Sequence, residues 1–295
     1  NCDVGSVTVK LSDEGTYHIT VGCTDMGTGC DTIIAQFAAD VLETPIDNIS
    51  VYGVDTDISP YDSGSYASST TYLTGMAAVK ACEQLRERII ALAAVRMNKD
   101  ASALTFDGEN VIDESDGAKM SLFDIATASM CNNEISLEVT YSHSSPVSPP
   151  PFMAACAEIE ADPETGAIEL LDYTACVDCG TVVNTNLARV QTEGGLLQGI
   201  GMTLYEDIWY DERGKNLSNS FMQYKVPSRL DTDRIRVEFD SSYEPTGPFG
   251  AKSIGEIVIN TPAPAIAQAV YNATGVWINE LPITPEKILK GMKVI

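Results

Sequence analysis

The chain has 295 residues, of which 44% are hydrophobic and 20% are charged, a balance typical of a folded globular protein and not of a disordered one. Its 42 acidic and 18 basic residues give a formal net charge of −24, which repels phosphate backbones and anionic membrane surfaces. We therefore expect no nucleic-acid binding and no membrane binding. No apolar run approaches the roughly 18 residues of a membrane-spanning helix, and no signal peptide is visible, so we expect a cytoplasmic protein.

Eight cysteines are present, at positions 2, 23, 30, 82, 131, 156, 176 and 179. In a chain of this size without a secretory signal, we expect reduced and mostly buried thiols instead of disulfides. Cys176 and Cys179 form the only CxxC, and the only histidines are His18 and His143. These residues give little support to a zinc or iron–sulfur site in this chain.

Alternating polar and apolar residues in the first half predict strands, and apolar residues at steps of three and four predict helices. The expected strands are 6–11, 16–23, 49–54, 104–112 and 135–142. The expected helices are 31–42, 72–97 and 121–129. Asp31 or Thr32 is the expected N-cap of the first helix, because short polar side chains accept hydrogen bonds from the first free N–H groups.

The proline-rich segment 144–151 interrupts both patterns and predicts a linker. Beyond it we expect a hairpin over 153–177 that turns at 162–166, a strand at 234–239, and helices at 186–204, 259–273 and 285–292. The helix at 186–204 contains four glycines, which predict close approach of another backbone. The whole pattern indicates an α+β fold, with mixed sheets and helices, in two subdomains over 1–147 and 148–295.

Three loops have one character in common: small residues, hydroxyls or glycines that lead into a predicted helix. They are 25–29 (DMGTG), 65–71 (SYASSTT) and 250–256 (GAKSIGE). Helix N-termini with flanking glycines bind anions, so three such loops suggest a long phosphate-bearing ligand. Each loop alone is also explained by capping and tight turns. None matches the P-loop or the dinucleotide-binding fingerprint.

Glu256 ends the third of these loops, next to Ile254, Ile257 and Val258. These neighbours predict an apolar pocket around the carboxylate. Such a pocket raises the pKa of a carboxylate, which suits a general base near neutral pH. The alternative is a glutamate that only stabilises the first turn of a helix. Spacing alone favours this alternative.

Residues 247–256 (GPFGAKSIGE) resemble the GPxGAKGxGE signature of the molybdenum hydroxylases, the family of xanthine dehydrogenase and aldehyde oxidoreductase. Other segments resemble this family in the same order along the chain: 25–42, 64–75, 178–201 and 261–289. The resemblance covers the C-terminal half of the family's molybdenum-binding region. It implies the α+β fold of that region.

The resemblance implies a role for each matching residue. Glu256 falls on the catalytic base, and Gln191 on the glutamine that hydrogen-bonds the pterin. The other positions implied to contact the cofactor are Gly27, Thr28, Gly29, Ala67, Ser68, Ser69, Thr70, Thr71, Lys252, Ser253, Ile254 and Gly255. No protein side chain is expected to bind the metal directly. Two positions depart from the family: Thr28 replaces a glutamine, and Ser253 replaces a glycine.

The resemblance also implies cofactors and partners. We expect a molybdopterin, in its cytosine dinucleotide form, carrying molybdenum with a sulfido or selenido ligand. A large molybdopterin subunit would supply the other half of the site, and iron–sulfur and FAD centres would lie on further subunits. This division is typical of nicotinate dehydrogenases, so we expect a role in nicotinate degradation, with nicotinate hydroxylated to 6-hydroxynicotinate by oxygen from water. The alternatives are a xanthine or purine hydroxylase, an aldehyde oxidoreductase, or a non-catalytic scaffold subunit.

Overall fold

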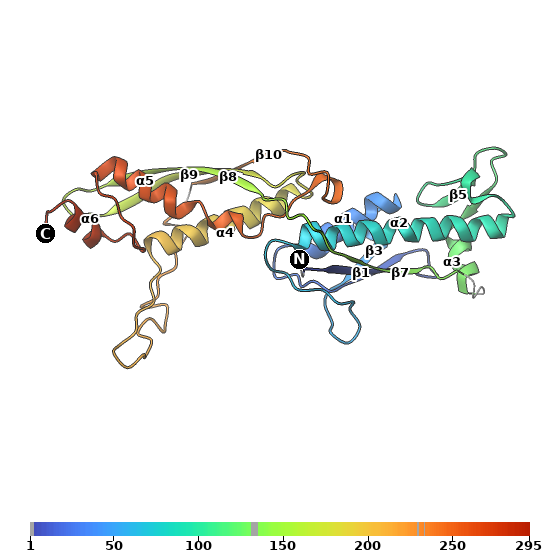
Figure 1. Cartoon of the computed structure of the whole chain (residues 1–295), viewed down its shortest axis with the longest axis horizontal. Helices are drawn as coiled ribbons and strands as arrows, with labels where there is room; N and C mark the ends of the chain where they lie inside the picture. The colour runs from blue at the N-terminus through green and yellow to red at the C-terminus, as the bar shows by residue number, and fades with distance from the viewer. Residues whose placement is uncertain (1–2, 131–134, 229, 233) are drawn as a thin grey trace. The chain divides into compact units, whose positions relative to one another are not determined.

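The structure of the chain is a computed structural model that describes residues 3–130, 135–228, 230–232 and 234–295 (Figure 1). It divides into two compact units. The first contains Asn1–Pro149 and Tyr243–Ser253, and the second contains Pro150–Ser242 and Ile254–Ile295. Both units combine helices with mixed sheets, which confirms the α+β class.

The first unit is built on a four-stranded sheet in the order β3-β2-β1-β7. Its strands are β1 (Gly5–Leu11), β2 (Tyr17–Val21), β3 (Ile49–Tyr52) and β7 (Glu138–His143). β1 is antiparallel to β2 and β7, whereas β2 and β3 are parallel. Helices α1 (Cys30–Leu42) and α2 (Thr70–Met97) pack against each other and against this sheet. The buried side chains of alternate positions, such as Val7, Val9 and Ile19, form the core beneath them.

A small antiparallel sheet, β4-β5-β6, follows α2. It consists of β4 (Leu104–Phe106), β5 (Asn110–Asp113) and β6 (Lys119–Ser121), and it leads into α3 (Leu122–Met130). The single strand expected over 104–112 is therefore wrong. Asp107 makes the difference, because its carboxylate accepts hydrogen bonds from the N–H groups of Glu109 and Asn110 and closes a turn there.

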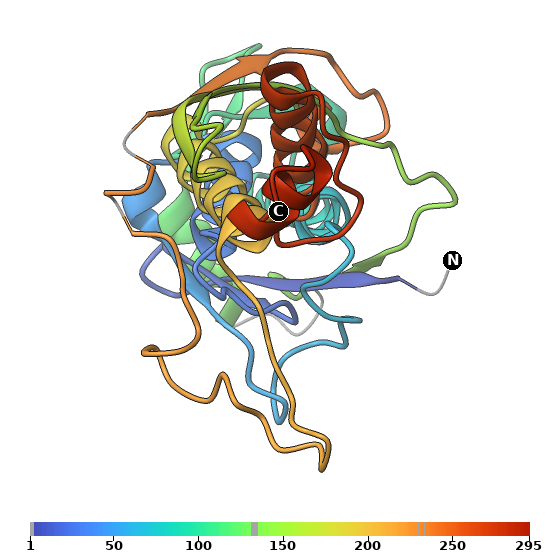
Figure 2. The ribbon, with the colours of Figure 1, turned by 90° about the vertical axis from the view of Figure 1, so that its left-hand side faces the viewer.

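The second unit is built on a three-stranded sheet in the order β10-β9-β8. β8 (Phe152–Ala161) and β9 (Ile168–Asp178) form the expected antiparallel hairpin, and β10 (Ile235–Asp240) lies parallel to β9. Helices α4 (Thr185–Leu204) and α5 (Pro262–Thr274) lie along one side of this sheet, and α6 (Pro285–Gly291) follows (Figure 2). Leu196 and Ile200 of α4 join Tyr173, Val237 and Ile266 in the core.

The helix expected over 259–273 is present, but it starts three residues later than expected. A short 3₁₀ turn spans Ile257–Ile259, and α5 begins at Pro262. Proline has no N–H to donate to the preceding turn, so it stands at the start of a helix and does not continue one.

Among the described residues, none of the helices has both the length and the apolar composition required to cross a bilayer.

Glycines allow α4 to lie against the 3₁₀ turn, which confirms the expected close approach for part of the glycine set. A Cβ on Gly195 would lie 2.1 Å from Val258 Cγ2, and a Cβ on Gly199 would lie 2.6 Å from Pro262 Cγ. A Cβ on Gly194, the neighbour of Gly195, would meet nothing within 4 Å. Only some of the helical glycines are therefore required by packing.

We expect Gly195→Ala to destabilise the second unit by about 2–3 kcal/mol, because the new methyl group overlaps a buried valine. The matched control is Gly194→Ala, which we expect to stabilise the chain by up to about 1 kcal/mol because alanine favours helix. Urea unfolding of the two variants measures both effects. Equal effects of the two substitutions would contradict the packing role of Gly195.

Candidate functional site

The loop before α2 has an unusual backbone. Ala67 and Ser68 are consecutive non-glycine residues in the left-handed region, with φ of 52° and 53°. Such a conformation costs about 1–3 kcal/mol per residue and collects at functional sites. It turns the chain into the first residues of α2, Thr70 and Thr71, whose N–H groups have no acceptor within the helix. The loop therefore presents backbone donors and the helix dipole in the same place.

Side-chain bonds tie this loop to the segment 22–29 within the first unit. Ser65 Oγ accepts a hydrogen bond from Thr24 N–H and donates one to Thr24 C=O, both at 2.9 Å. The carboxylate of Asp62 accepts hydrogen bonds from Thr74 Oγ at 3.0 Å and from Gly64 N–H at 2.9 Å, which joins the loop to the first turns of α2. Two of the three loops singled out in the sequence therefore lie side by side.

Asp25 organises the segment 25–29 from inside. Its carboxylate accepts hydrogen bonds from the N–H groups of Gly27 at 2.9 Å, Gly29 at 3.1 Å and Asp31 at 3.4 Å. Helix α1 thus begins at Cys30 with Gly29 as its N-cap, and the expected N-cap at Asp31 or Thr32 is wrong. The reason is that Asp25, outside the helix, already satisfies these donors. The N–H groups of Gly27 and Gly29 are consequently directed at a carboxylate of the chain itself, which leaves the half-buried Thr28 to offer its side chain.

The first part of the third loop belongs to the same unit. Ser253 is buried, and its Oγ accepts a hydrogen bond of 3.3 Å from Tyr72 N–H in the first turn of α2. Lys252 beside it is also buried, with 8% of its surface exposed. The hydroxyl that departs from the family's glycine therefore acts as a cap for α2 from 181 positions away. Within the first unit, residues 250–253 of the third loop therefore lie with the 65–71 loop at the N-terminal end of α2, and the 22–29 segment is bound to the same loop.

The remaining site residues belong to the second unit. Gln191 of α4 donates a hydrogen bond from its side-chain amide to Gly255 C=O at 3.4 Å, so these two residues are brought together. Glu256 follows as the residue before the 3₁₀ turn, and Ile254 is half-buried. Glu256 itself is exposed. The apolar pocket expected around its carboxylate is therefore not formed by the described residues of this chain, because Val258 is buried against α4 and Ile254 and Ile257 are only half-buried.

The structure adds residues that the sequence reasoning missed. Asp25, Asp62, Ser65 and Tyr72 all hold the loops in place through side-chain or backbone hydrogen bonds. An Asp two residues before a glycine is a known signal for such a turn, and both Asp25 and Asp62 fit it.

Of the cysteines, Cys23, Cys30, Cys82 and Cys179 are buried as expected, but Cys156 and Cys176 are exposed because they lie on the outer face of a strand pair. Cys2 and Cys131 lie outside the described residues.

Known proteins share this chain's sequence and fold. Residues 2–233 match the family model of the molybdopterin cofactor-binding domain. The chain is 38% identical, over 99% of its length, to the "Probable hypoxanthine oxidase XdhD" of Escherichia coli. It is 32% identical, over 95% of its length, to subunit gamma of the 6-hydroxypseudooxynicotine dehydrogenase complex of Paenarthrobacter nicotinovorans. The crystal structure of quinoline 2-oxidoreductase from Pseudomonas putida 86 matches 99% of the chain with a TM-score of 0.90 and 27% identity.

The chain therefore belongs to the molybdopterin cofactor-binding domain family of the molybdenum hydroxylases. It spans 31% of the first of these relatives, 36% of the second and 38% of the chain in the solved structure. About two thirds of each relative thus has no counterpart in this sequence.

The Asp25 carboxylate gives a pH dependence with a defined sign. Partial burial by itself raises the pKa of this group, but the N–H groups of Gly29 and Gly27 outweigh that effect and hold the pKa below its ordinary value of 3.8. The charged form therefore stabilises the fold above about pH 4, and this contribution disappears as the pH falls further. Asp25→Asn should lower stability at pH 7 by about 1 kcal/mol, because a neutral amide accepts these bonds less strongly.

The difference between wild type and Asp25→Asn should narrow from about pH 5 to pH 3 in thermal unfolding. Asp40→Asn is the control, because Asp40 is exposed near the C-terminal end of the same helix, where the helix dipole does not stabilise a negative side chain. That variant should be no less stable than wild type. A constant difference across this pH range would contradict the role given to the Asp25 carboxylate.

The left-handed backbone at Ala67 gives a second test. Ala67→Gly should change the free energy of unfolding by less than about 1 kcal/mol, because relief of strain offsets the greater entropy of the unfolded chain. Ala67→Val should destabilise by about 1–3 kcal/mol, because a β-branched side chain fits this region poorly. Urea unfolding measures both. A tolerated valine would mean that the loop is not held in this conformation.

Proposed function

We propose that this chain is the molybdopterin-binding part of a molybdenum hydroxylase and that Glu256 is its catalytic base. The observation that carries the proposal is that segments 22–29, 65–71 and 250–253 lie together in the first unit, around the start of α2, in a chain of the molybdopterin-binding family. In an acidic chain, this end of α2 gathers what an anionic cofactor requires: backbone N–H groups, hydroxyls and a buried lysine.

The residues at this end of α2 fit a phosphate-bearing pterin. The first turn of α2 offers its backbone N–H groups as donors, and the hydroxyls of Thr70 and Thr71 are further donors beside them. The left-handed backbone at Ala67 and Ser68 fixes the direction in which the chain enters this turn. Ser69 donates its hydroxyl proton to Tyr66 C=O at 2.8 Å, so it supports the loop and offers its oxygen only as an acceptor. Lys252 would add positive charge for the phosphates. We assign cofactor contacts to Thr28, Gln191 and the 252–255 backbone on the family resemblance.

When bound, the molybdenum centre supplies the oxygen-transfer and two-electron redox chemistry of hydroxylation. This chain's own contribution to the chemistry would be proton transfer: the Glu256 carboxylate takes up the proton that is released when a water-derived oxygen is transferred to the substrate. The exposure of Glu256 is consistent with a base that reaches outward from this chain. A polypeptide that corresponds to the unmatched part of these relatives would then complete the enclosure of the carboxylate and exclude water.

We propose a small N-heteroaromatic substrate, hydroxylated at an electron-poor ring carbon, with nicotinate converted to 6-hydroxynicotinate as the first candidate. The names of two of the relatives support the class, since hypoxanthine and quinoline are N-heteroaromatic rings. Hypoxanthine is the second candidate, because a probable hypoxanthine oxidase is 38% identical to this chain. Parallel turnover assays of the assembled enzyme with nicotinate, hypoxanthine and an aldehyde distinguish these from an aldehyde oxidoreductase.

The partners are part of the same proposal. A large molybdopterin subunit would supply the other half of the site, and iron–sulfur and FAD subunits would carry electrons away, because the described residues include only one cysteine-containing group, Asp25, Cys30 and Asp31, with metal-ligand spacing. We place the enzyme in the cytoplasm and assign the pterin the cytosine dinucleotide form. Molybdenum analysis of the purified complex distinguishes a cofactor-binding subunit from a scaffold subunit without cofactor.

Glu256→Gln keeps the shape of the side chain and removes the base. We expect turnover by the assembled enzyme to fall about 10³-fold or more, which corresponds to roughly 4 kcal/mol of barrier, with molybdenum content unchanged. Glu169→Gln is the matched control, an exposed glutamate on β9 of the same unit, and should leave turnover unchanged. Normal turnover by a molybdenum-replete Glu256→Gln enzyme would remove Glu256 from the mechanism.

A further inference from the structure

A long arm projects from the second unit between the end of α4 and the start of β10. This arm comprises residues 205–232, of which the structure describes all except 229. In two perpendicular views it leaves the C-terminal end of α4 and returns toward β10 (Figures 1 and 2). A connection of this length without a helix or strand is uncommon in a compact domain and is usually functional.

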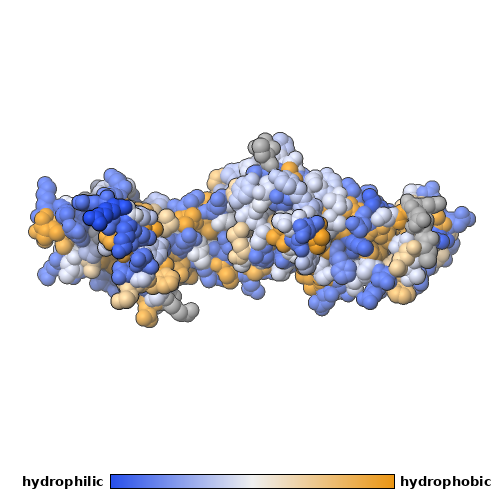
Figure 3. All heavy atoms as spheres, turned by 90° about the horizontal axis from the view of Figure 1, so that it is seen from below, coloured by the Kyte–Doolittle hydropathy of each residue, from blue (hydrophilic) through white to orange (hydrophobic). Residues whose placement is uncertain are grey.

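The arm carries large apolar side chains that the described chain leaves exposed. Phe221 and Met222 are each 80% exposed at adjacent positions. The other members are Ile208, Trp209, Tyr210, Leu217, Val226 and Leu230, with exposed fractions from 46% to 96%. Hydrophobic and hydrophilic side chains lie side by side on the face from which the arm projects (Figure 3). So many exposed large apolar side chains on one segment indicate a surface that another molecule covers.

The arm nevertheless has a defined conformation. Its tip is a hairpin in which Tyr210 pairs with Asn216, and the carboxylate of Asp211 accepts hydrogen bonds from the N–H groups of Arg213 and Lys215 at 2.9 Å. A second turn joins the N–H groups of Gln223 and Tyr224 to Ser220 C=O. Because its backbone is organised while its apolar side chains remain outside, the arm is preformed for binding.

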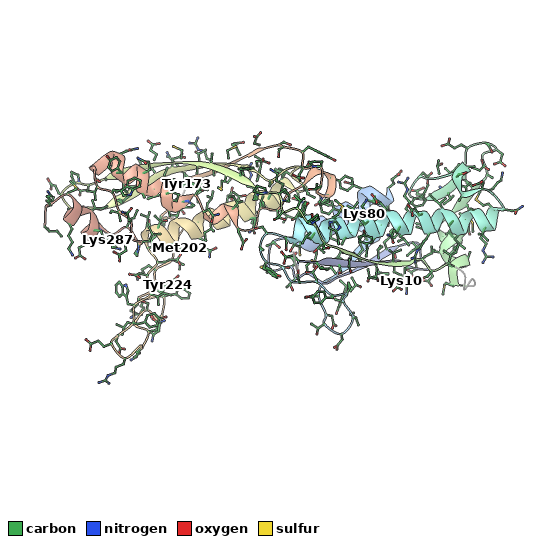
Figure 4. The ribbon with its side chains drawn as sticks, in the orientation of Figure 1. Lys10, Lys80, Tyr173, Met202, Tyr224 and Lys287 are labelled. Carbon is green, nitrogen blue, oxygen red and sulfur yellow. The ribbon has the colours of Figure 1, made fainter. Side chains whose placement is uncertain are left out.

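A clasp at the base holds the arm to α4. Tyr224 donates a hydrogen bond from its hydroxyl to the carboxylate of Glu206, which joins the two stems of the arm. Both stems also pack closely against Gly201 of α4. A Cβ at this position would lie 2.2 Å from Glu206 Oε1 and 2.9 Å from Pro227 Cδ. Figure 4 shows Tyr224 at the base of the arm, close to Met202 on α4.

The charge of the arm differs from that of the chain. The arm holds five acidic and four basic residues, whereas the whole chain has a net charge of −24. A nearly neutral, apolar segment favours burial against a protein surface. Two copies of the whole chain would repel each other, which disfavours self-association as the reason for the exposure.

We propose that the arm is the docking element for the large molybdopterin subunit, which would carry the rest of the molybdenum-binding region, with Phe221 and Met222 as its anchor side chains. The occupant follows from the comparisons: the quinoline 2-oxidoreductase structure shares the fold over 99% of this chain, yet that fold makes up only 38% of its chain. The fold thus occurs there within a much longer polypeptide. This inference rests on the proposed function only in the choice of occupant.

The test is tryptic cleavage of the arm, because Arg213, Lys215 and Lys225 are exposed cleavage sites on it. In the chain purified alone, cleavage at these sites should be rapid. In the assembled complex it should slow at least tenfold, and cleavage at the exposed Lys119, on the edge strand β6 of the first unit, serves as the internal reference. Equal cleavage of the arm in both preparations overturns the proposal.

A Phe221→Ser/Met222→Ser double variant tests the anchors. It should leave the melting temperature of the isolated chain unchanged, because both side chains are exposed, and should reduce recovery of the complex at least tenfold in affinity purification. Phe123→Ser, at a 59% exposed position on α3, is the control and should assemble normally. Full assembly of the double variant overturns the proposal, as does a dimer of the isolated chain that the double variant abolishes. If the complex holds molybdenum and is active while trypsin still cleaves the arm as fast as in the chain alone, the docking role is wrong and the proposed function is unaffected.

Discussion

The N-terminal end of α2 determines how the first unit is organised. A helix of 28 residues leaves its first N–H groups without acceptors in the helix, and these groups must find partners elsewhere. In this chain one of them, Tyr72 N–H, is satisfied by the hydroxyl of Ser253. In the loop that precedes α2, the hydroxyl of Ser65 bonds the backbone of Thr24 and so holds the 22–29 segment nearby. Residue 253 is thus held at this helix terminus by an N–H group that needs an acceptor, whereas the first loop is attached through Ser65 and keeps its own donors on Asp25.

Most of the fold could be predicted from the sequence because its elements are long and their periods are clear. The hairpin of β8 and β9 and the helices α2 and α4 lie within a few residues of their expected bounds. The failures occur where a single side chain or ring decides the local path. Asp107 splits an expected strand, and Pro262 sets a later start for an expected helix. Neither effect changes the hydrophobic pattern, so periodicity does not detect it.

For the candidate site, sequence reasoning identified the loops but not the bonds that join them. The link between Tyr72 and Ser253 spans 181 positions, and no local pattern encodes such a contact. Asp25 presents a different case. The segment 25–29 has the composition of an anion-binding turn, yet the anion that its N–H groups meet is a carboxylate of the same chain. Composition indicates that donors are present, and only the structure tells where they point.

The cap from Ser253 has a consequence for biosynthesis. A ribosome releases the start of α2 long before it synthesises position 253, so the first unit lacks one of its own segments until more than four fifths of the chain exists. Contacts of such high sequence separation form late and slowly in folding. A cofactor that needs this end of the helix complete could thus bind only after position 253 has left the ribosome, and a chain terminated before that position would lack the hydroxyl that caps α2.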